Sequence, residues 1–81
     1  MKYEEFIAAA LEGRDTRVLA NRLGMSIQQL ENYRNYKSVP GYAAAMKLAR
    51  EAGLDDRLDL VFQILADEEM RKKGLRNSFL A

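Results

Sequence analysis

The chain of 81 residues contains no cysteine and no histidine. Without cysteine it has neither a disulfide framework nor a thiolate metal site. Without histidine it lacks the commonest metal ligand and the commonest general base. The residues most often used for metal binding and acid–base catalysis are therefore missing, and we expect no cofactor.

Long apolar runs are also missing. No stretch is long enough to span a bilayer, and the chain does not begin with the basic and then apolar pattern of a secretory signal. We therefore expect a soluble, cytoplasmic protein. The length corresponds to one small domain.

The net charge is only +1, but the charges are unevenly distributed along the chain. Residues 14–50 carry a balance of +5, whereas residues 1–13 and residues 51–81 each sum to −2. A concentration of positive charge on one segment suits a phosphate-binding face. The alternative is chance clustering on a solvated surface.

Residues 16–35 are predicted to form two short helices joined by a tight turn. Gly24 lies where the first helix must end, because glycine tolerates the left-handed conformation of such an ending. Ser26 and Gln29 form a capping box that begins the second helix. Apolar side chains of both helices are expected to face inward: Val18, Leu19, Ala20, Leu23, Leu30 and Tyr33.

This segment resembles the helix-turn-helix of the lambda-repressor and Cro-type DNA-binding domains. The matching residues are Ala20 at the close-approach position, Leu23 and Gly24 at the turn, and Met25, Leu30 and Tyr33 at the three buried positions. The later patterns N-Y-R-N-Y-K-S-V-P and A-x-K-L-A-x-x-x-G-L-D extend the resemblance over roughly residues 5–58. The resemblance implies a phage or prophage repressor that binds a palindromic operator in double-stranded DNA as a homodimer.

The resemblance also implies an all-α fold, a compact bundle of five helices. The remaining three helices are predicted at residues 2–12, 40–52 and 56–73, with Gly13 and Gly53 at helix ends and Asp55 as the cap of the last helix. The predicted inward residues of the first and fourth helices are Tyr3, Phe6, Ile7, Ala10, Leu11, Tyr42, Ala45, Met46, Ala49 and Ala52. We expect one domain over residues 1–74 and a short tail over residues 75–81.

The last predicted helix carries two apolar stripes. One stripe comprises Leu58, Val61, Phe62 and Leu65, and the other comprises Leu60 and Ile64. A small bundle covers only one face of its last helix, so the second stripe needs another partner. The predicted homodimer interface lies within residues 58–70 and contains Leu60, Phe62, Ile64 and Leu65.

The second helix of the predicted motif, residues 26–36, is rich in amide side chains. Gln and Asn can present a donor and an acceptor side by side to adenine in the major groove. The predicted base-reading residues are Ile27, Gln28, Gln29 and Asn32. Gln29 is the lesser candidate because the capping box occupies it, and Ile27 either contacts a thymine methyl group or is half-buried against the turn. Glu31 either accepts from cytosine or pairs with Arg34, and we favour the pair.

Phosphate contacts are expected from the start of the first helix of the motif and from the loop after the second. The predicted phosphate-binding residues are Thr16, Arg17, Arg22, Arg34, Asn35, Lys37 and Ser38. Thr16 and Arg17 lie where the resembled family anchors the DNA backbone, although a helix start needs a cap in any case. Alternatively, the segment after the second helix is an ordinary solvated loop that contacts no phosphate. Tyr36 either takes part in the phosphate contact or only covers the core.

Two acidic clusters are candidates for catalytic groups, Asp55-Asp56-x-x-Asp59 and Asp67-Glu68-Glu69. The first opens a helix, where acids favour the dipole, and the second suits pairing with the basic residues that follow it. No EF-hand spacing, glycine-rich phosphate loop or nucleophile–base arrangement is present. We therefore expect a protein that is not an enzyme.

Two other functions remain open. A helix-turn-helix can serve as a scaffold for protein interaction, for example in an antirepressor or a host-factor inhibitor, and the near-neutral net charge favours this alternative mildly. An accessory factor for recombination or excision would bind DNA without controlling a promoter. A steep loss of binding with salt separates DNA binding from a hydrophobic protein contact.

Overall fold

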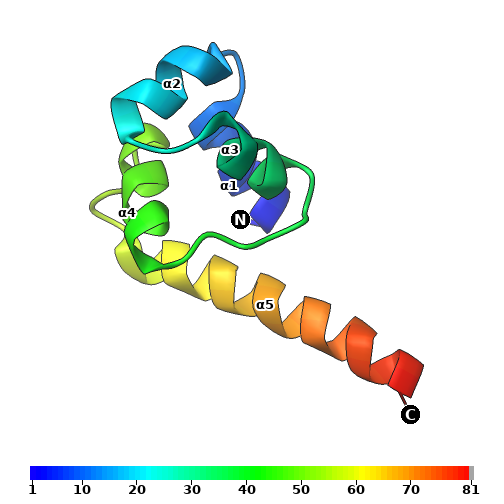
Figure 1. Ribbon diagram of the computed structural model, residues 1–81. Coiled ribbons are helices and arrows are strands. Elements are labelled where there is room, and N and C mark those ends of the chain that lie inside the picture. The colour runs from blue at the N-terminus through cyan, green and yellow to red at the C-terminus, as the bar shows by residue number, and fades with distance from the viewer. Residues whose placement is uncertain (81) are drawn as a thin grey trace.

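A computed structural model describes the backbone of residues 1–80 and the side chains of residues 1–74. Five α-helices and no strand occur in this part of the chain, which confirms the predicted all-α fold class (Figure 1). The helices are α1 (Tyr3–Leu11), α2 (Thr16–Leu23), α3 (Ile27–Arg34), α4 (Tyr42–Glu51) and α5 (Leu58–Leu80).

Helix α1 is the central element, because it packs against α3, α4 and α5. All five apolar residues predicted to face inward from this helix are buried, as expected from their helical spacing. The largest fully buried side chains come from four helices: Phe6, Leu11, Leu30, Leu48 and Val61. Burial of each such side chain stabilises the folded state by about 1.5–3 kcal/mol. Because α1 packs against three of the other helices, it organises the core.

The inward face of α4 differs from the predicted one. Ala45 and Ala49 are buried as predicted, but Leu48 is also buried, whereas Tyr42 is 70% exposed and Met46 is 40% exposed. With 3.6 residues per turn, Met46 lies about 100° around the helix from Ala45, at the edge of the buried face. Leu48 lies on the opposite edge and is the larger apolar side chain that the core takes.

The prediction for α2 is correct for Leu19 and Ala20, which are buried, and wrong for Val18, which is 63% exposed. Leu23 is partly buried against the core. Only these two adjacent positions of the short helix are buried, and Val18 lies on its solvent side.

Two glycines end helices as predicted. Gly24 (φ 69°) and Gly53 (φ 74°) adopt the left-handed conformation after α2 and α4. The residue after each glycine donates its backbone N–H back across the last turn, from Met25 to the Ala20 carbonyl at 2.9 Å and from Leu54 to the Ala49 carbonyl at 2.8 Å. These are Schellman motifs, which satisfy carbonyls that the helix end would leave without partners.

Three predicted helix boundaries are wrong at their starts or ends. Helix α3 stops at Arg34 instead of residue 36, and α4 begins at Tyr42 with Gly41 as its cap instead of at Pro40. Asp55 does not cap α5, because that helix begins at Leu58 and the carbonyl of the preceding residue accepts its first bond, from the Val61 N–H at 3.1 Å.

Helix α5 continues well beyond its predicted end. It passes through Gly74 and runs to Leu80, so the predicted tail of residues 75–81 is helical over its described part, and residue 81 lies outside the described residues. A single glycine inside a helix costs only about 1 kcal/mol relative to alanine, and no proline follows to stop the helix. The far end of α5 projects away from the other four helices (Figure 1).

The second apolar stripe of α5 is covered within the chain itself. Ile64 of this stripe is 4% exposed, and Leu60 is partly buried against the core. The other two predicted interface residues belong to the first stripe, where Leu65 is 7% exposed and Phe62 is partly buried. The premise that this stripe needs another subunit is therefore wrong, because both α1 and α4 pack on α5 and together cover more than one of its faces. The homodimer itself stays a prediction.

Candidate nucleic-acid interface

The start of α2 is capped by Asp15, the residue directly before the helix. Asp15 Oδ1 accepts the backbone N–H groups of Arg17 at 2.9 Å and Val18 at 3.2 Å. The Thr16 hydroxyl is thereby left for another partner, and it accepts Arg34 Nη2 at 3.4 Å. This contact joins the start of α2 to the end of α3.

The start of α3 carries the predicted capping box. The Gln29 N–H donates to Ser26 Oγ at 3.0 Å, and the Ser26 N–H donates to Gln29 Oε1 at 3.1 Å. The side-chain oxygen of Gln29 is therefore engaged in the cap, which is the reason for ranking Gln29 below the other predicted base readers.

A side chain of α4 holds the turn between α2 and α3. Lys47 Nζ donates to the Leu23 carbonyl at 2.8 Å and so caps the end of α2. Of the three positions expected to join the two helices, Leu30 and Tyr33 are buried and Met25 is partly buried. The relative placement of α2 and α3 is fixed by these side chains and by the backbone of the turn.

On the outward face of α3, two predicted base readers are bonded to each other. Gln28 Nε2 donates to Asn32 Oδ1 at 2.9 Å, one helical turn away. Gln28 is exposed and Asn32 half-buried, and Ile27 beside them is 42% exposed. The bond leaves Gln28 Oε1 as an acceptor and Asn32 Nδ2 as a donor, so the pair presents both hydrogen-bonding functions in a fixed orientation.

Glu31 pairs with Arg34, as the sequence analysis favoured. Arg34 Nη1 lies 3.0 Å from Glu31 Oε1. The charge of Arg34 is balanced by this carboxylate, and its second nitrogen is held by Thr16. Arg34 is therefore first a link between α2 and α3, and a phosphate would have to compete with Glu31 for it.

Arg22 also has a structural role that the sequence did not reveal. Arg22 Nη2 lies 2.6 Å from Glu51 Oε2, and Arg14 pairs with the same oxygen. Arg14 Nη2 also donates to the Glu51 backbone carbonyl at 2.8 Å. These bonds tie the turn before α2, the end of α2 and the end of α4 together, so Arg22 is engaged within the protein.

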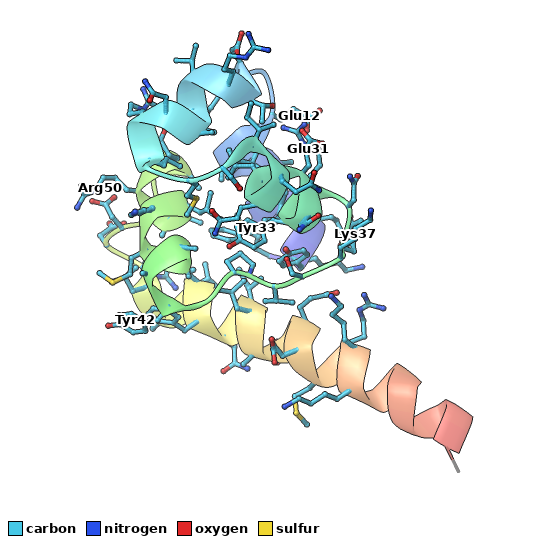
Figure 2. All side chains as sticks on the ribbon, in the orientation of Figure 1. Glu12, Glu31, Tyr33, Lys37, Tyr42 and Arg50 are labelled. Carbon is cyan, nitrogen blue, oxygen red and sulfur yellow. The ribbon has the colours of Figure 1, made fainter. Side chains whose placement is uncertain are left out.

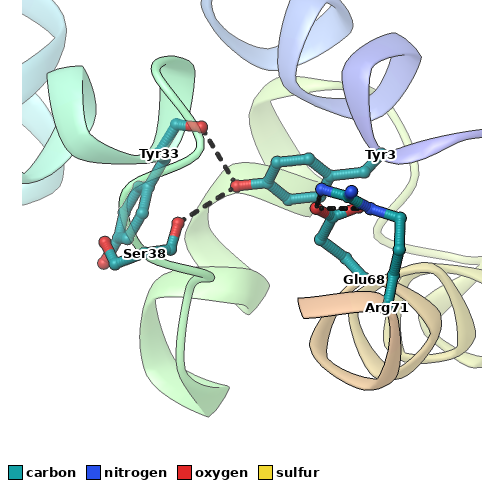
Figure 3. Close-up of polar contacts among 5 residues, drawn as sticks. All are labelled: Tyr3, Tyr33, Ser38, Glu68 and Arg71. Carbon is teal, nitrogen blue, oxygen red and sulfur yellow. Dashed lines mark hydrogen bonds and ion pairs between the residues drawn. The ribbon is translucent and has the colours of Figure 1, made fainter. Parts of the chain in front are cut away.

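The loop after α3 is anchored by Tyr3. The buried Tyr3 hydroxyl donates to the Tyr33 carbonyl at 3.1 Å and lies 3.4 Å from the Ser38 carbonyl (Figure 3). Burial, together with the negative charge of Glu68, raises the pKa of Tyr3 well above its ordinary value. The neutral hydroxyl therefore joins α1 to the last turn of α3 and to the middle of the loop.

Tyr36 gives this loop its sharp change of direction. It is the one residue other than glycine with a positive φ (61°) in the described chain. The Lys37 N–H donates to the Asn32 carbonyl at 2.9 Å, and the Tyr36 ring lies 5.8 Å from the Tyr3 ring, centroid to centroid. Tyr36 thus ends α3 and also packs beside the core.

The predicted phosphate-binding residues therefore fall into two groups. Arg22 and Arg34 have carboxylate partners. Arg17 and Lys37 are exposed, and among the side chains of residues 1–74 no ion pair involves either of them. Asn35 is exposed and Ser38 half-buried in the loop beside Lys37. Arg17 and Lys37 are therefore the two predicted phosphate-binding cations whose charge no carboxylate within residues 1–74 balances.

Two other kinds of site are not found in the described part of the chain. Its acidic residues nowhere gather in a group of three that could hold a metal ion. None of its helices is both long enough and apolar enough to cross a membrane.

Known proteins offer no relative for comparison, since no family model, no curated protein and no solved structure matches this chain. The resemblance to lambda-repressor and Cro-type domains therefore rests on the residue pattern alone. What the chain does has to be inferred from its own residues and their geometry.

Proposed function

We propose that the chain is a sequence-specific double-stranded DNA-binding regulator of transcription, a phage or prophage repressor of the Cro type. In this proposal α2 and α3 form a helix-turn-helix, and α3 enters the major groove with its N-terminal half. The observation that carries the proposal is the Gln28–Asn32 amide pair on the exposed face of a capped helix. An ordinary solvated helix would more often show Lys and Glu there.

The amide pair supplies the sequence discrimination. A Gln or Asn side chain recognises adenine through a donor–acceptor pair at N6 and N7, and a good bidentate contact contributes about 1–3 kcal/mol against the wrong base. Because Gln28 and Asn32 already hold each other, little side-chain freedom is lost when they bind. Ile27 lies next to them and offers an apolar contact for a thymine methyl group.

Phosphate contacts supply affinity that does not depend on sequence. Arg17 in the first turn of α2 and Lys37 after α3 are the two unpaired cations of the predicted set, and Thr16, Asn35 and Ser38 add polar groups. Each phosphate neutralised steepens the fall of log K with log salt by about 0.9. Binding is therefore expected to weaken steeply as salt rises.

A palindromic operator requires two copies of the chain with their recognition helices about 34 Å apart. We place the contact between copies on an apolar patch that consists of the exposed Tyr42 and Met46 and the partly buried Phe62. The Tyr42 and Phe62 rings stack with their centroids 5.1 Å apart, and Met46 lies one turn after Tyr42. Ile64 and Leu65 are excluded from this contact because the core already covers them.

Selection from a pool of random duplex DNA tests the proposal. The wild type is compared with the variant Gln28→Ala/Asn32→Ala, and Gln63→Ala is the matched control. Gln63 also donates to a residue one turn later, Asp67 at 2.9 Å, but on α5. We expect the wild type and the control to enrich one palindromic motif and the double variant to lose it.

The other outcomes identify the competing functions. Enrichment by none of the three proteins at low salt would reject DNA reading and favour the protein-interaction scaffold. Enrichment of a motif that leaves a linked promoter unaffected in a reporter assay would favour the recombination or excision accessory factor.

A further inference from the structure

Helix α5 meets the loop after α3 at a basic concavity. Ser38 and Val39 of the loop line it together with Glu69, Lys72 and Lys73 of α5, around a volume of about 310 Å³. The loop runs alongside α5, and Lys37 lies on it directly before Ser38 (Figure 2). Residues some 35 positions apart in sequence thus form one surface, which we call the α5–loop surface.

Three ammonium groups of this surface have no partner within the described side chains. The arginines at positions 14, 22, 34, 57 and 71 all pair with carboxylates, and Lys47 is held by a backbone carbonyl. The side chains of Lys37, Lys72 and Lys73 take part in none of the ion pairs or side-chain hydrogen bonds of residues 1–74. Glu69 is the one acidic side chain lining the concavity, so the α5–loop surface keeps a positive balance.

Apart from Glu69, the nearest acidic residues of α5 are engaged elsewhere. Glu68 is buried and pairs with Arg71, and Asp67 accepts from Gln63 on another side of the helix. The sum of charges over residues 51–81 is −2, which hides this separation. Glu68 and Asp67 are therefore held by other side chains of α5, while Lys72 and Lys73 lie beside the loop with Glu69 as their one acidic neighbour in the concavity.

We propose that Lys72 and Lys73 bind DNA phosphates and extend the contact of Lys37 and Ser38 onto α5. This inference rests on the proposed function, because it uses the same DNA backbone that the loop follows. Lysine contacts phosphate as a point charge, so the contact adds affinity and positions the duplex but reads no base. Helix α5 thereby becomes part of the interface as well as part of the core.

The test is the salt dependence of binding to a random-sequence duplex of about 30 base pairs, followed by fluorescence anisotropy. The variant Lys72→Gln/Lys73→Gln should flatten the slope of log K against log salt by about 1.8, since each contact contributes about 0.9. Lys73→Gln alone should flatten it by about half as much. Glu69→Gln should tighten binding, because it removes the carboxylate that competes with phosphate.

Arg50→Gln is the matched control for Lys73→Gln. Arg50 is an exposed cation without an ion pair among residues 1–74, and it lies on α4 on the other side of the molecule from Lys37 (Figure 2). Its substitution makes the same change in net charge, and the slope should stay at its wild-type value. Circular dichroism of all variants should match the wild type, because the substituted side chains lie at the surface.

The results separate this inference from the function on which it rests. A wild type that does not bind duplex DNA at low salt overturns both. A wild type that binds with a steep salt dependence, while Lys73→Gln behaves as Arg50→Gln does, overturns the role of α5 alone. Weaker binding by Glu69→Gln also overturns it, since the removal of a negative charge from a phosphate site has the opposite effect.

Discussion

At the scale of single residues, Tyr36 shows how a local cost is offset by packing. A left-handed backbone at a non-glycine residue costs about 1–2 kcal/mol. The Tyr36 ring lies against Tyr3, whose hydroxyl contacts the Tyr33 carbonyl in the last turn of α3 and the Ser38 carbonyl in the same loop. The aromatic contact therefore opposes the strain, and the loop that carries Lys37 keeps one shape.

Substitutions at position 36 should reverse the usual order of alanine and glycine. Tyr36→Ala loses the ring and keeps the strain, whereas Tyr36→Gly loses the ring and relieves the strain, so the glycine variant should be more stable by about 1 kcal/mol. Urea unfolding measures the difference. At Ala43, which is exposed within α4, glycine should instead destabilise by about 1 kcal/mol. Equal stability of the two position-36 variants would contradict the strain.

Tyr3→Phe should lower the free energy of unfolding by about 1–3 kcal/mol, because the substitution leaves the Tyr33 and Ser38 carbonyls without this donor in a buried setting. Thermal or urea unfolding near neutral pH measures the loss. Tyr42→Phe is the control, since its hydroxyl takes part in no hydrogen bond among residues 1–74, and its stability should equal that of the wild type within about 0.5 kcal/mol.

Tyr3 also predicts a dependence of stability on alkaline pH. Burial raises its pKa in the folded protein, so the unfolded chain loses this proton first. The stability from Tyr3 is therefore complete below pH of about 10, the pKa of an unfolded tyrosine, and falls as pH rises beyond it. Tyr3→Phe should lose less stability above that pH than the wild type and Tyr42→Phe. Parallel losses in all three proteins would contradict the assignment.

At the scale of elements, the sequence revealed those features that depend on neighbouring residues. Gly24, Gly53 and the Ser26–Gln29 capping box act through bonds to residues a few positions away, and all three were predicted correctly. The burial of Ile64 depends on α1, which is some 55 residues away in sequence, and no local pattern reveals it.

The candidate site divides in the same way. The amide face of α3 and the Glu31–Arg34 pair follow from helical spacing and were predictable. The engagement of Arg22 by Glu51, and the meeting of Lys72 with Ser38, depend on how helices pack, so the sequence could not show them.

The carboxylate of Glu51 joins three elements, and its removal should loosen them together. Glu51→Gln leaves Arg14 and Arg22 without their common partner, and we expect a loss of about 1 kcal/mol after allowance for the exposure of both arginines. Urea unfolding at low and high salt measures it, and the loss should shrink as salt rises. Glu12→Gln, an exposed residue without an ion pair among residues 1–74, should change stability by less than about 0.5 kcal/mol.

At the scale of the whole molecule, the shape and the net charge of the protein bear on the proposed DNA binding in different ways. The molecule measures 43 × 27 × 20 Å, and α5 projects beyond the other helices along its length (Figure 1). The net charge of +1 gives little overall attraction to DNA. In the proposed function, affinity for DNA therefore comes from the positions of the unpaired cations and from the simultaneous binding of two copies.

The last prediction concerns those two copies. The wild type should sediment at twice its chain mass of 9.3 kDa at tens of micromolar protein. Tyr42→Glu places a charge in the exposed apolar patch and should give a folded monomer, because this side chain is 70% exposed and its loss leaves the core intact. Gln63→Glu, with the same added charge at an exposed position of α5, should remain a dimer.

Sedimentation and operator binding together decide what the dimer does. A wild-type monomer would reject the dimer, and a dimeric Tyr42→Glu variant would reject this surface. The monomeric variant should keep the salt dependence of a single copy on random duplex DNA and lose the tighter binding to a palindromic site, because two linked half-site contacts raise affinity without any new contact. Equal binding of palindromic DNA by the monomeric variant and the wild type would show that one copy reads the site alone.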